Sequence, residues 1–194
     1  MSSSYRLELD RWLAGLDVKA ETVLDVGGSQ LPIKGRTKSW DVGEYLIADL
    51  PEPHVGSPAP DIELDLNSFD EGVSTGDTYY KYFDVVFCLE TFDYVWNTYF
   101  AFESIRSFLK PGGTAWITFP SVYPLNQPIE DDALRYMPAG IKKLAEAAHF
   151  SIEEMIPRVA ETYSFNDFCR IERLRAAKGQ DHRIVGWIVK FVKS

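Results

Sequence analysis

The chain is poor in cysteine and in the patterns that bind metals. Its 194 residues include two cysteines, Cys88 and Cys169, and neither belongs to a Cys-x-x-Cys or Cys/His spacing that predicts a zinc site. Cys88 lies in an apolar run, which is typical of a small, reduced core residue. We therefore expect a protein of the cytoplasm without a metal centre.

Basic charge and long hydrophobic runs are also scarce. The 20 lysines and arginines are outnumbered by 29 aspartates and glutamates, which gives a net charge of −9. A nucleic-acid groove usually carries a basic stripe, because neutralising phosphates supplies much of the affinity, so we expect no nucleic-acid partner. No apolar run approaches the ~20 residues that span a bilayer, and no signal-peptide pattern is visible. These absences favour one soluble domain over residues 1–194, a monomer or homodimer with no membrane partner.

The most informative stretch is an apolar run that breaks into a glycine turn. Residues 22–26 predict a buried strand, and Gly27, Gly28 and Ser29 follow at once. Glycine tolerates positive φ and has no Cβ to hold a ligand away. Asp25 places a carboxylate at the carboxyl end of the strand, where ligands bind in open α/β sheets. The stretch therefore predicts a ligand site.

Periodicities along the rest of the chain predict alternating strands and helices. Apolar residues recur at helical spacing in segment 1–20, which predicts an N-terminal helix that packs on the sheet or covers the cleft. Residues 31–40 predict a turn or a short distorted helix, and residues 120–138 predict an irregular insertion on the substrate side. Further strands are expected at 44–48, 62–66, 83–89, 114–119, 151–156 and 183–192, and helices at 96–110, 139–149 and around 164–174. This alternation predicts an α/β fold with a doubly wound, mostly parallel sheet.

Two cofactor classes bind beside an acidic strand end and a glycine turn. A dinucleotide needs Gly-x-Gly-x-x-Gly, and here Ser29 and Pro32 occupy the second and third glycine positions. S-adenosylmethionine has no phosphate, and its sulfonium and ammonium groups suit nearby carboxylates. Asp49 suits two ribose hydroxyls, Asp65 suits the adenine amino group, and Glu90 ends the next strand. These acids favour the sulfonium cofactor, and an NAD-type oxidoreductase stays the less favoured alternative.

Three motifs accompany the predicted strands one, four and five. Residues 23–28 (VLDVGG), 83–90 (FDVVFCLE) and 108–117 (FLKPGGTAWI) match motif I, the strand-four motif and the strand-five hairpin of one family. Over residues 20–156 the chain resembles the class I S-adenosylmethionine-dependent methyltransferases of the methyltransferase type 11-like group, in particular members found with glycan-biosynthesis genes. The resemblance implies S-adenosyl-L-methionine as cofactor. It also implies a seven-stranded Rossmann-like sheet of order 3-2-1-4-5-7-6, with strand seven antiparallel and helices on both faces. The cofactor-binding residues that it implies are Asp25, Gly27, Gly28, Ser29, Asp49, Leu50, Asp65, Leu66, Leu89 and Glu90.

The sequence departs from the family pattern at three positions. Ser29 and Leu31 replace a glycine and another small residue, and Tyr94 stands where a histidine is common. These departures leave open a second hypothesis, a relative that binds the cofactor without catalysis and serves as an interaction protein.

Candidates for contact with the methyl acceptor follow strand four or lie in the insertion. They are Asp93, Tyr94, Asp131, Asp132 and Arg135, and Arg135 can instead pair with either of the two insertion aspartates. No Asp/Asn-Pro-Pro-Tyr/Phe motif follows strand four, which argues against methylation of a nucleobase or amide nitrogen. We therefore predict methyl transfer to a small-molecule or glycan acceptor, at oxygen.

Overall fold

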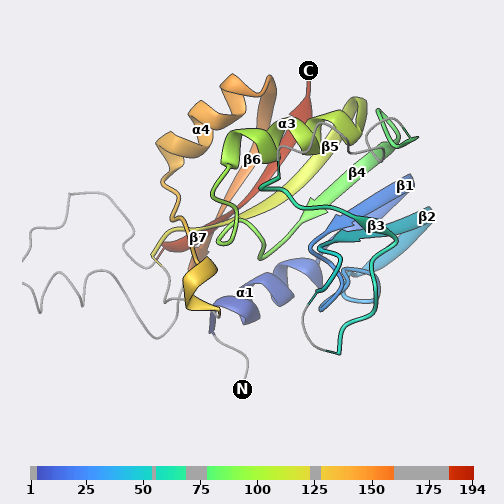
Figure 1. The fold of residues 1–194 in the computed structure, drawn as a ribbon, viewed down its shortest axis with the longest axis horizontal. Coiled ribbons are helices and arrows are strands. Elements are labelled where there is room, and N and C mark those ends of the chain that lie inside the picture. The colour runs from blue at the N-terminus through green and yellow to red at the C-terminus, as the bar shows by residue number, and fades with distance from the viewer. Residues whose placement is uncertain (1–3, 54–55, 69–77, 123–127, 160–183) are drawn as a thin grey trace, which may run out of the picture.

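The computed structural model describes residues 4–53, 56–68, 78–122, 128–159 and 184–194. Seven strands form one sheet in the order β3-β2-β1-β4-β5-β7-β6 (Figure 1). Strands β1 to β5 are parallel to one another, and β7 runs antiparallel between β5 and β6. The strands are β1 (Asp17–Val26), β2 (Ser39–Asp49), β3 (Ile62–Glu63), β4 (Phe83–Cys88), β5 (Leu109–Pro120), β6 (Phe150–Val159) and β7 (Ile184–Lys193). The predicted strand order and the antiparallel β7 are confirmed.

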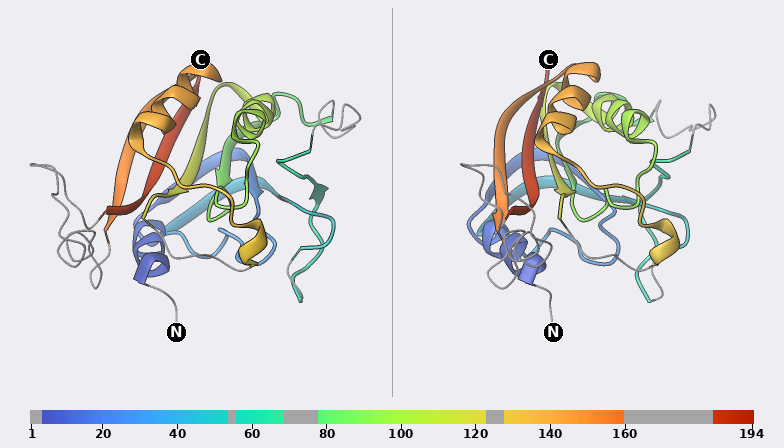
Figure 2. Two further views of the ribbon diagram at one scale, coloured as in Figure 1. Left: turned by 60° about the vertical axis from the view of Figure 1, so that its left-hand side comes forward. Right: turned by 90° about the vertical axis from the view of Figure 1, so that its left-hand side faces the viewer.

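Helices cover both faces of this sheet. The helices α3 (Thr98–Phe108) and α4 (Pro138–Ala147) pack on one face, and α1 (Ser4–Leu13) packs on the other (Figures 1 and 2). A short 3-10 helix, η1 (Ile129–Asp131), lies in the predicted insertion. Within the described segments, no helix is long and apolar enough to span a membrane.

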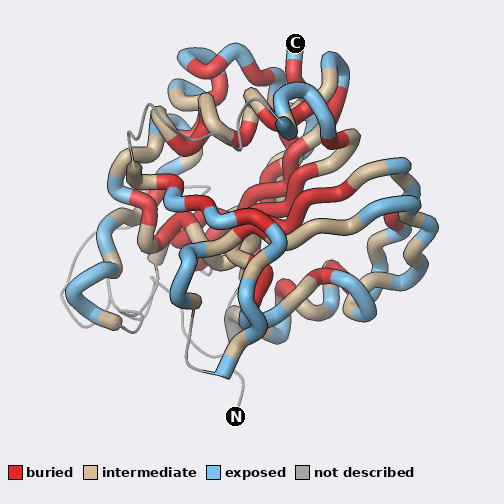
Figure 3. Tube along the Cα trace, turned by 45° about the vertical axis from the view of Figure 1, so that its right-hand side comes forward, coloured by how far each residue is buried: buried red, intermediate tan, exposed pale blue. Residues whose placement is uncertain are grey.

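The central strands bury consecutive residues on opposite faces. Val23 joins the apolar cluster beneath α1, and Leu24 joins the larger cluster beneath α3 and α4. In β4, Phe87 belongs to the cluster beneath α1 and Cys88 to the cluster beneath α3 and α4, so the buried Cys88 is a core residue as expected. The strands at the centre of the molecule are therefore buried over much of their length, as Figure 3 shows. A continuous apolar run is what a strand covered on both faces requires.

Several boundaries differ from the predicted ones. The third strand pairs with β2 only over Ile62–Glu63, although burial alternates from residue 62 to residue 66. The period-2 pattern here reflects an extended segment that packs on the core, not a longer ladder. The strands β1 and β2 begin at Asp17 and Ser39, earlier than predicted, because they pair from their first residues onward. The helix expected around 164–174 and Cys169 lie outside the described residues.

The helix expected at 96–110 is shorter at both ends. It begins at Thr98, because the backbone N–H groups of Trp96 and Asn97 both donate to the side-chain oxygen of Asn67. It ends at Phe108, because the next residue already belongs to β5. Residues 27–38, which join β1 to β2, contain turns and no helix, as the weak periodicity of 31–40 predicted.

Candidate active site

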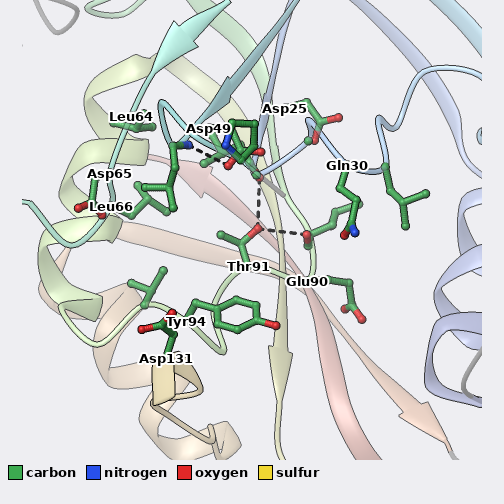
Figure 4. A pocket seen from close by; sticks show the side chains of 18 of the residues that line it. Asp25, Gln30, Asp49, Leu64, Asp65, Leu66, Glu90, Thr91, Tyr94 and Asp131 are labelled. Atoms are coloured by element: carbon green, nitrogen blue, oxygen red, sulfur yellow. Dashed lines mark hydrogen bonds between the residues drawn. The ribbon is translucent and has the colours of Figure 1, made fainter. Parts of the chain in front are cut away.

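A cavity of about 1550 Å³ opens at the carboxyl ends of the parallel strands (Figure 4). Its wall comes from the segments that follow β1, β2, β3 and β4, from residues 128–133 and from α1. Most residues predicted for the site lie on this wall: Asp25, Gly27, Gly28, Asp49, Leu50, Asp65, Leu66, Leu89, Glu90, Tyr94 and Asp131. The structure therefore brings together side chains that lie far apart in the sequence.

The glycine turn is tight because side chains of the chain itself fill the space beside it. Gly27 has a φ of +78°, and a Cβ built there would lie 2.3 Å from Oγ1 of Thr91. A Cβ at Gly28 would lie 2.5 Å from a carboxylate oxygen of Asp25. Thr91 is fixed in turn by donating to the carbonyl oxygen of Leu89, at 3.1 Å. Both glycines are thus required by internal packing, whatever ligand approaches the turn.

Asp25 holds the segment that follows the turn. Its Oδ2 accepts hydrogen bonds from the backbone N–H of Ile33, at 2.8 Å, and from the Tyr45 hydroxyl, at 2.6 Å. Burial raises the pKa of Asp25 to about 6, although both hydrogen bonds favour the ionised form. A buried carboxylate is therefore the centre around which residues 27–33 fold.

Asp49 joins the glycine turn to the end of β2. Its Oδ2 accepts from the backbone N–H of Ser29, at 3.0 Å, and its Oδ1 from the N–H of Leu50, at 2.8 Å. Each carboxylate oxygen has a second acceptor site, so both can also receive hydroxyl hydrogens. Ser29 itself is buried and does not line the cavity; its contribution is the bond to Asp49.

Glu90 is held in an unusual conformation at the end of β4. Its φ of 56° lies in the left-handed region, which non-glycine residues rarely adopt. Its backbone N–H donates to the Thr118 hydroxyl, at 2.7 Å, and that hydroxyl donates to Oε1 of Glu90, at 3.0 Å. The guanidinium of Arg158 donates two hydrogen bonds to the same carboxylate, from Nη1 to Oε1 at 2.5 Å and from Nη2 to Oε2 at 3.2 Å. Such strain persists only where surrounding contacts over-determine the conformation, as they do here.

Arg158 extends from β6 to Glu90 across the intervening strand β7, beside a glycine that has no side chain. It lies opposite Gly186 of β7, where a Cβ would lie 2.7 Å from the carbonyl oxygen of Phe119 and 3.7 Å from Cδ of Arg158. A side chain at position 186 would therefore clash with the backbone of β5 and lie directly against Arg158. Sequence reasoning missed Arg158, because it lies beyond the predicted end of that strand and belongs to no motif.

The loop after β4 is held from two sides. On one side the hydroxyl of Tyr136 donates to the carbonyl oxygens of Phe92 and Val95, at 3.1 Å and 3.2 Å. On the other side Asn67 donates to the carbonyl oxygen of Tyr94, at 3.0 Å. Sequence reasoning missed Asn67 as well, since a lone asparagine after a strand carries no recognisable signal.

The catalytic candidates do not form one group. Tyr94 and Asp131 line the cavity, whereas Asp93 and Arg135 are not part of its wall. Asp93 is buried, and its backbone carbonyl accepts from the N–H of Ala133, at 2.7 Å. Arg135 forms a two-point ion pair with Asp132, at 2.5 Å and 2.6 Å, which is the pairing that the sequence offered as its alternative role.

The chemistry of the wall suits a ligand that carries positive charge. Among the residues that the structure describes, the basic ones on the wall are Arg6 and Arg36, and Arg36 is paired with Asp10 at 2.8 Å. Its acidic residues are Asp25, Asp49, Glu52, Asp65, Glu90, Glu130 and Asp131. A dinucleotide pyrophosphate is bound by amides at a helix N-terminus, and residues 27–38 provide no helix. The wall thus fits the sulfonium and ammonium groups of S-adenosylmethionine better than it fits a pyrophosphate.

No family model and no curated protein sequence matches the chain. Several solved structures do match the fold of the chain. A candidate methyltransferase from Bacillus halodurans matches with a TM-score of 0.61 at 16% identity, over 96% of this chain and 98% of that one. An S-adenosylmethionine-dependent methyltransferase from Mesorhizobium loti matches with a TM-score of 0.60 at 13% identity, over 97% and 98%.

A third structure contains ligands. It is the 1,6-didemethyltoxoflavin-N1-methyltransferase of Burkholderia thailandensis with 1,6-didemethyltoxoflavin and S-adenosylhomocysteine, and it matches with a TM-score of 0.60 at 13% identity, over 99% of this chain and 79% of that one. The strand order, the antiparallel β7 and these matches agree. The chain has the fold of the class I S-adenosylmethionine-dependent methyltransferases.

Proposed function

We propose that the protein is an S-adenosylmethionine-dependent methyltransferase that methylates a small-molecule or glycan acceptor, at oxygen. The observation that carries this proposal is the acidic cavity at the carboxyl ends of the strands, with Asp49 and Asp65 on the wall beyond β2 and β3. The methyltransferase neighbours support the cofactor class. The negative net charge of −9 supports an acceptor other than a nucleic acid. The free, buried Cys88 suits a reducing compartment, and we place the activity in the cytoplasm.

Each part of the wall has a role in this proposal. Asp49 binds the ribose hydroxyls, since its two oxygens lie at the cavity and are oriented by backbone amides. Asp65 binds the adenine amino group, and the apolar side chains of Leu50, Leu66 and Leu89 pack around the nucleoside. When bound, the cofactor supplies the electrophilic methyl group.

The protein's own contribution to the reaction is position and proton transfer. In methyl transfer the nucleophile must lie in line with the methyl group, so a rigid wall accelerates the reaction by orientation. Tyr94 lies on the wall beyond β4 and orients the acceptor. Asp131 is the exposed carboxylate among the catalytic candidates on the wall, and it accepts the proton of the acceptor hydroxyl.

A second function is favoured by one feature of the wall. Leu31 occupies a position where the family commonly has a small residue, and its side chain is 42% exposed at the cavity. A leucine beside the glycine turn narrows the space there, which suits a protein that binds the cofactor without turnover. Binding of S-adenosylhomocysteine without methyl transfer to any acceptor would support this alternative.

The proposal is tested by isothermal titration calorimetry with S-adenosylhomocysteine, with NAD as the control ligand. We expect binding of S-adenosylhomocysteine and none of NAD. Absence of binding at millimolar S-adenosylhomocysteine would refute the cofactor assignment. Methyl transfer is then sought with methyl-labelled cofactor and a panel of hydroxylated small molecules and sugars. Replacing Asp131 by asparagine should lower the rate of transfer while the affinity for S-adenosylhomocysteine is unchanged.

A further inference from the structure

The loop that follows β4, residues 91–97, contributes two aromatic residues to the cavity wall, and the proposed function assigns one of them, Tyr94, to the acceptor. Tyr94 and Trp96 both line the cavity, and Trp96 is 62% exposed. We call these two residues the acceptor wall. Since the loop has no regular secondary structure, the position of the wall depends on the contacts that hold the loop.

One set of contacts ties the loop to the insertion. The Tyr136 side chain is buried, and its hydroxyl donates to two loop carbonyl oxygens, those of Phe92 and Val95. The carbonyl oxygen of Asp93 accepts from the N–H of Ala133. These contacts involve none of the residues that follow β3.

The other set comes from the side chain of Asn67, which follows β3 and also lines the cavity. Its Oδ1 accepts from the N–H groups of Trp96 and Asn97, at 2.9 Å and 3.2 Å. Its Nδ2 donates to the carbonyl oxygen of Tyr94, at 3.0 Å. Both polar atoms of the Asn67 side chain therefore form hydrogen bonds with the loop, and they bind the backbone of both residues of the acceptor wall.

Asn67 is itself held by the carboxylate assigned to the adenine. The backbone N–H of Asn67 donates to Oδ1 of Asp65, at 2.8 Å. A continuous chain of hydrogen bonds thus runs from Asp65 through Asn67 to Tyr94 and Trp96.

We propose that Asn67 is a positioning residue that couples occupation of the adenosine end of the cavity to the position of the acceptor wall. This inference rests on the proposed function. The bound cofactor sets the wall before the acceptor arrives. Because such coupling is reciprocal, a ligand at the wall also changes the affinity for the cofactor.

The test follows Trp96 by fluorine NMR in full-length protein that contains 5-fluorotryptophan. The chain has five tryptophans, and the Trp96 resonance is assigned from its loss in Trp96→Phe. In the wild type we expect this resonance to move on saturation with S-adenosylhomocysteine. In Asn67→Ala we expect the ligand to bind about fivefold more weakly by calorimetry, at the lower end of usual coupling, and the resonance not to move.

Tyr136→Phe is the matched control, because it removes other hydrogen bonds to the same loop and leaves the path from Asp65 intact. We expect the wild-type affinity and the wild-type movement of the Trp96 resonance. Asn67→Asp keeps an acceptor for the two amides and loses the donor to Tyr94, so we expect a smaller movement than in the wild type. If Asn67→Ala fails to fold by circular dichroism, Asn67→Asp decides, and a full movement in it overturns the inference.

The outcomes separate the two proposals. If the wild type binds S-adenosylhomocysteine and the Trp96 resonance stays in place, the coupling is wrong and the proposed function stands. The same holds if Asn67→Ala shows the full movement, or if Tyr136→Phe abolishes it, since the loop then responds only to its general stability. If the wild type does not bind S-adenosylhomocysteine, both proposals fall.

Discussion

Replacing Asp25 by asparagine removes a buried charge and should change how the stability of the fold depends on pH. The pKa of this carboxyl is raised from its ordinary 3.8 to about 6. At ~1.4 kcal/mol for each pKa unit, ionisation of Asp25 costs the folded state about 3 kcal/mol. Because the pKa is higher in the folded state, this group's stabilising contribution is present below pH 3.8 and is lost as the pH rises through 6.

The assay is urea unfolding of the wild type and Asp25→Asn at pH 7 and at pH 5. Between these values the wild type should regain about 1.4 kcal/mol of unfolding free energy relative to the variant. Asp17 and Asp84 have lowered pKa values and lose stability as the pH falls, but they are present in both proteins and cancel in the comparison. A constant offset between the two proteins reflects lost hydrogen bonds and does not affect the reasoning. Parallel pH dependence in both proteins would refute it.

Tyr45→Phe tests the same carboxyl group, that of Asp25, by changing its pKa instead of removing it. The Tyr45 hydroxyl donates to Asp25 and lowers its pKa, so its removal should raise that pKa further. The pH at which this loss of stability is complete then moves upward, because it is set by the pKa of Asp25 in the folded state, whereas in Asp25→Asn the step is absent.

Three further substitutions probe two wall residues and the arginine that supports a third. Gly27→Ala places a Cβ 2.3 Å from Oγ1 of Thr91 at a φ of +78°, and should lower the unfolding free energy in urea by about 1–3 kcal/mol. Adding Thr91→Gly, which removes the hydroxyl, should restore part of this loss, whereas adding Thr91→Ser, which keeps it, should not. Asp49→Asn should weaken S-adenosylhomocysteine by about tenfold in calorimetry, as expected for charge-assisted hydrogen bonds lost to the ribose; unchanged affinity would exclude Asp49 as the ribose ligand. Arg158→Met leaves Glu90 without its ion-pair partner and should lower the unfolding free energy by about 3 kcal/mol, and adding Glu90→Gln should restore part of it.

Much of the sheet could be predicted because its signals are local. The strands β1 and β4 each contain a short run of consecutive apolar residues, since neighbours such as Val23 and Leu24 are buried on opposite faces. Asp49 and Asp65 could be placed at one edge of the sheet from strand ends alone, because the carboxyl ends of parallel strands meet there.

The remaining features depend on partners that are distant in sequence. The start of α3 is set by Asn67, which precedes Trp96 by 29 residues and has no helical signal of its own. The role of Glu90 depends on Arg158, 68 residues further along, and on a glycine in a third strand. The position of the glycine turn was predicted correctly, but the glycines were expected to leave room for a ligand. In the structure the side chains of Asp25 and Thr91 occupy the space beside them.

Gly186 has a consequence for mutational tolerance. It has no side chain, it lies on the strand between β5 and β6, and it is not part of the cavity wall. Yet a Cβ there would lie 2.7 Å from the carbonyl oxygen of Phe119 in β5 and against Arg158 of β6, so a bulky residue disturbs the packing around the arginine that holds Glu90. A saturation screen for ligand binding should therefore find Gly186 as intolerant as the wall residues themselves, and β7 and the edge strand β6, which contribute no residue to the described wall, become part of the selection acting on the site.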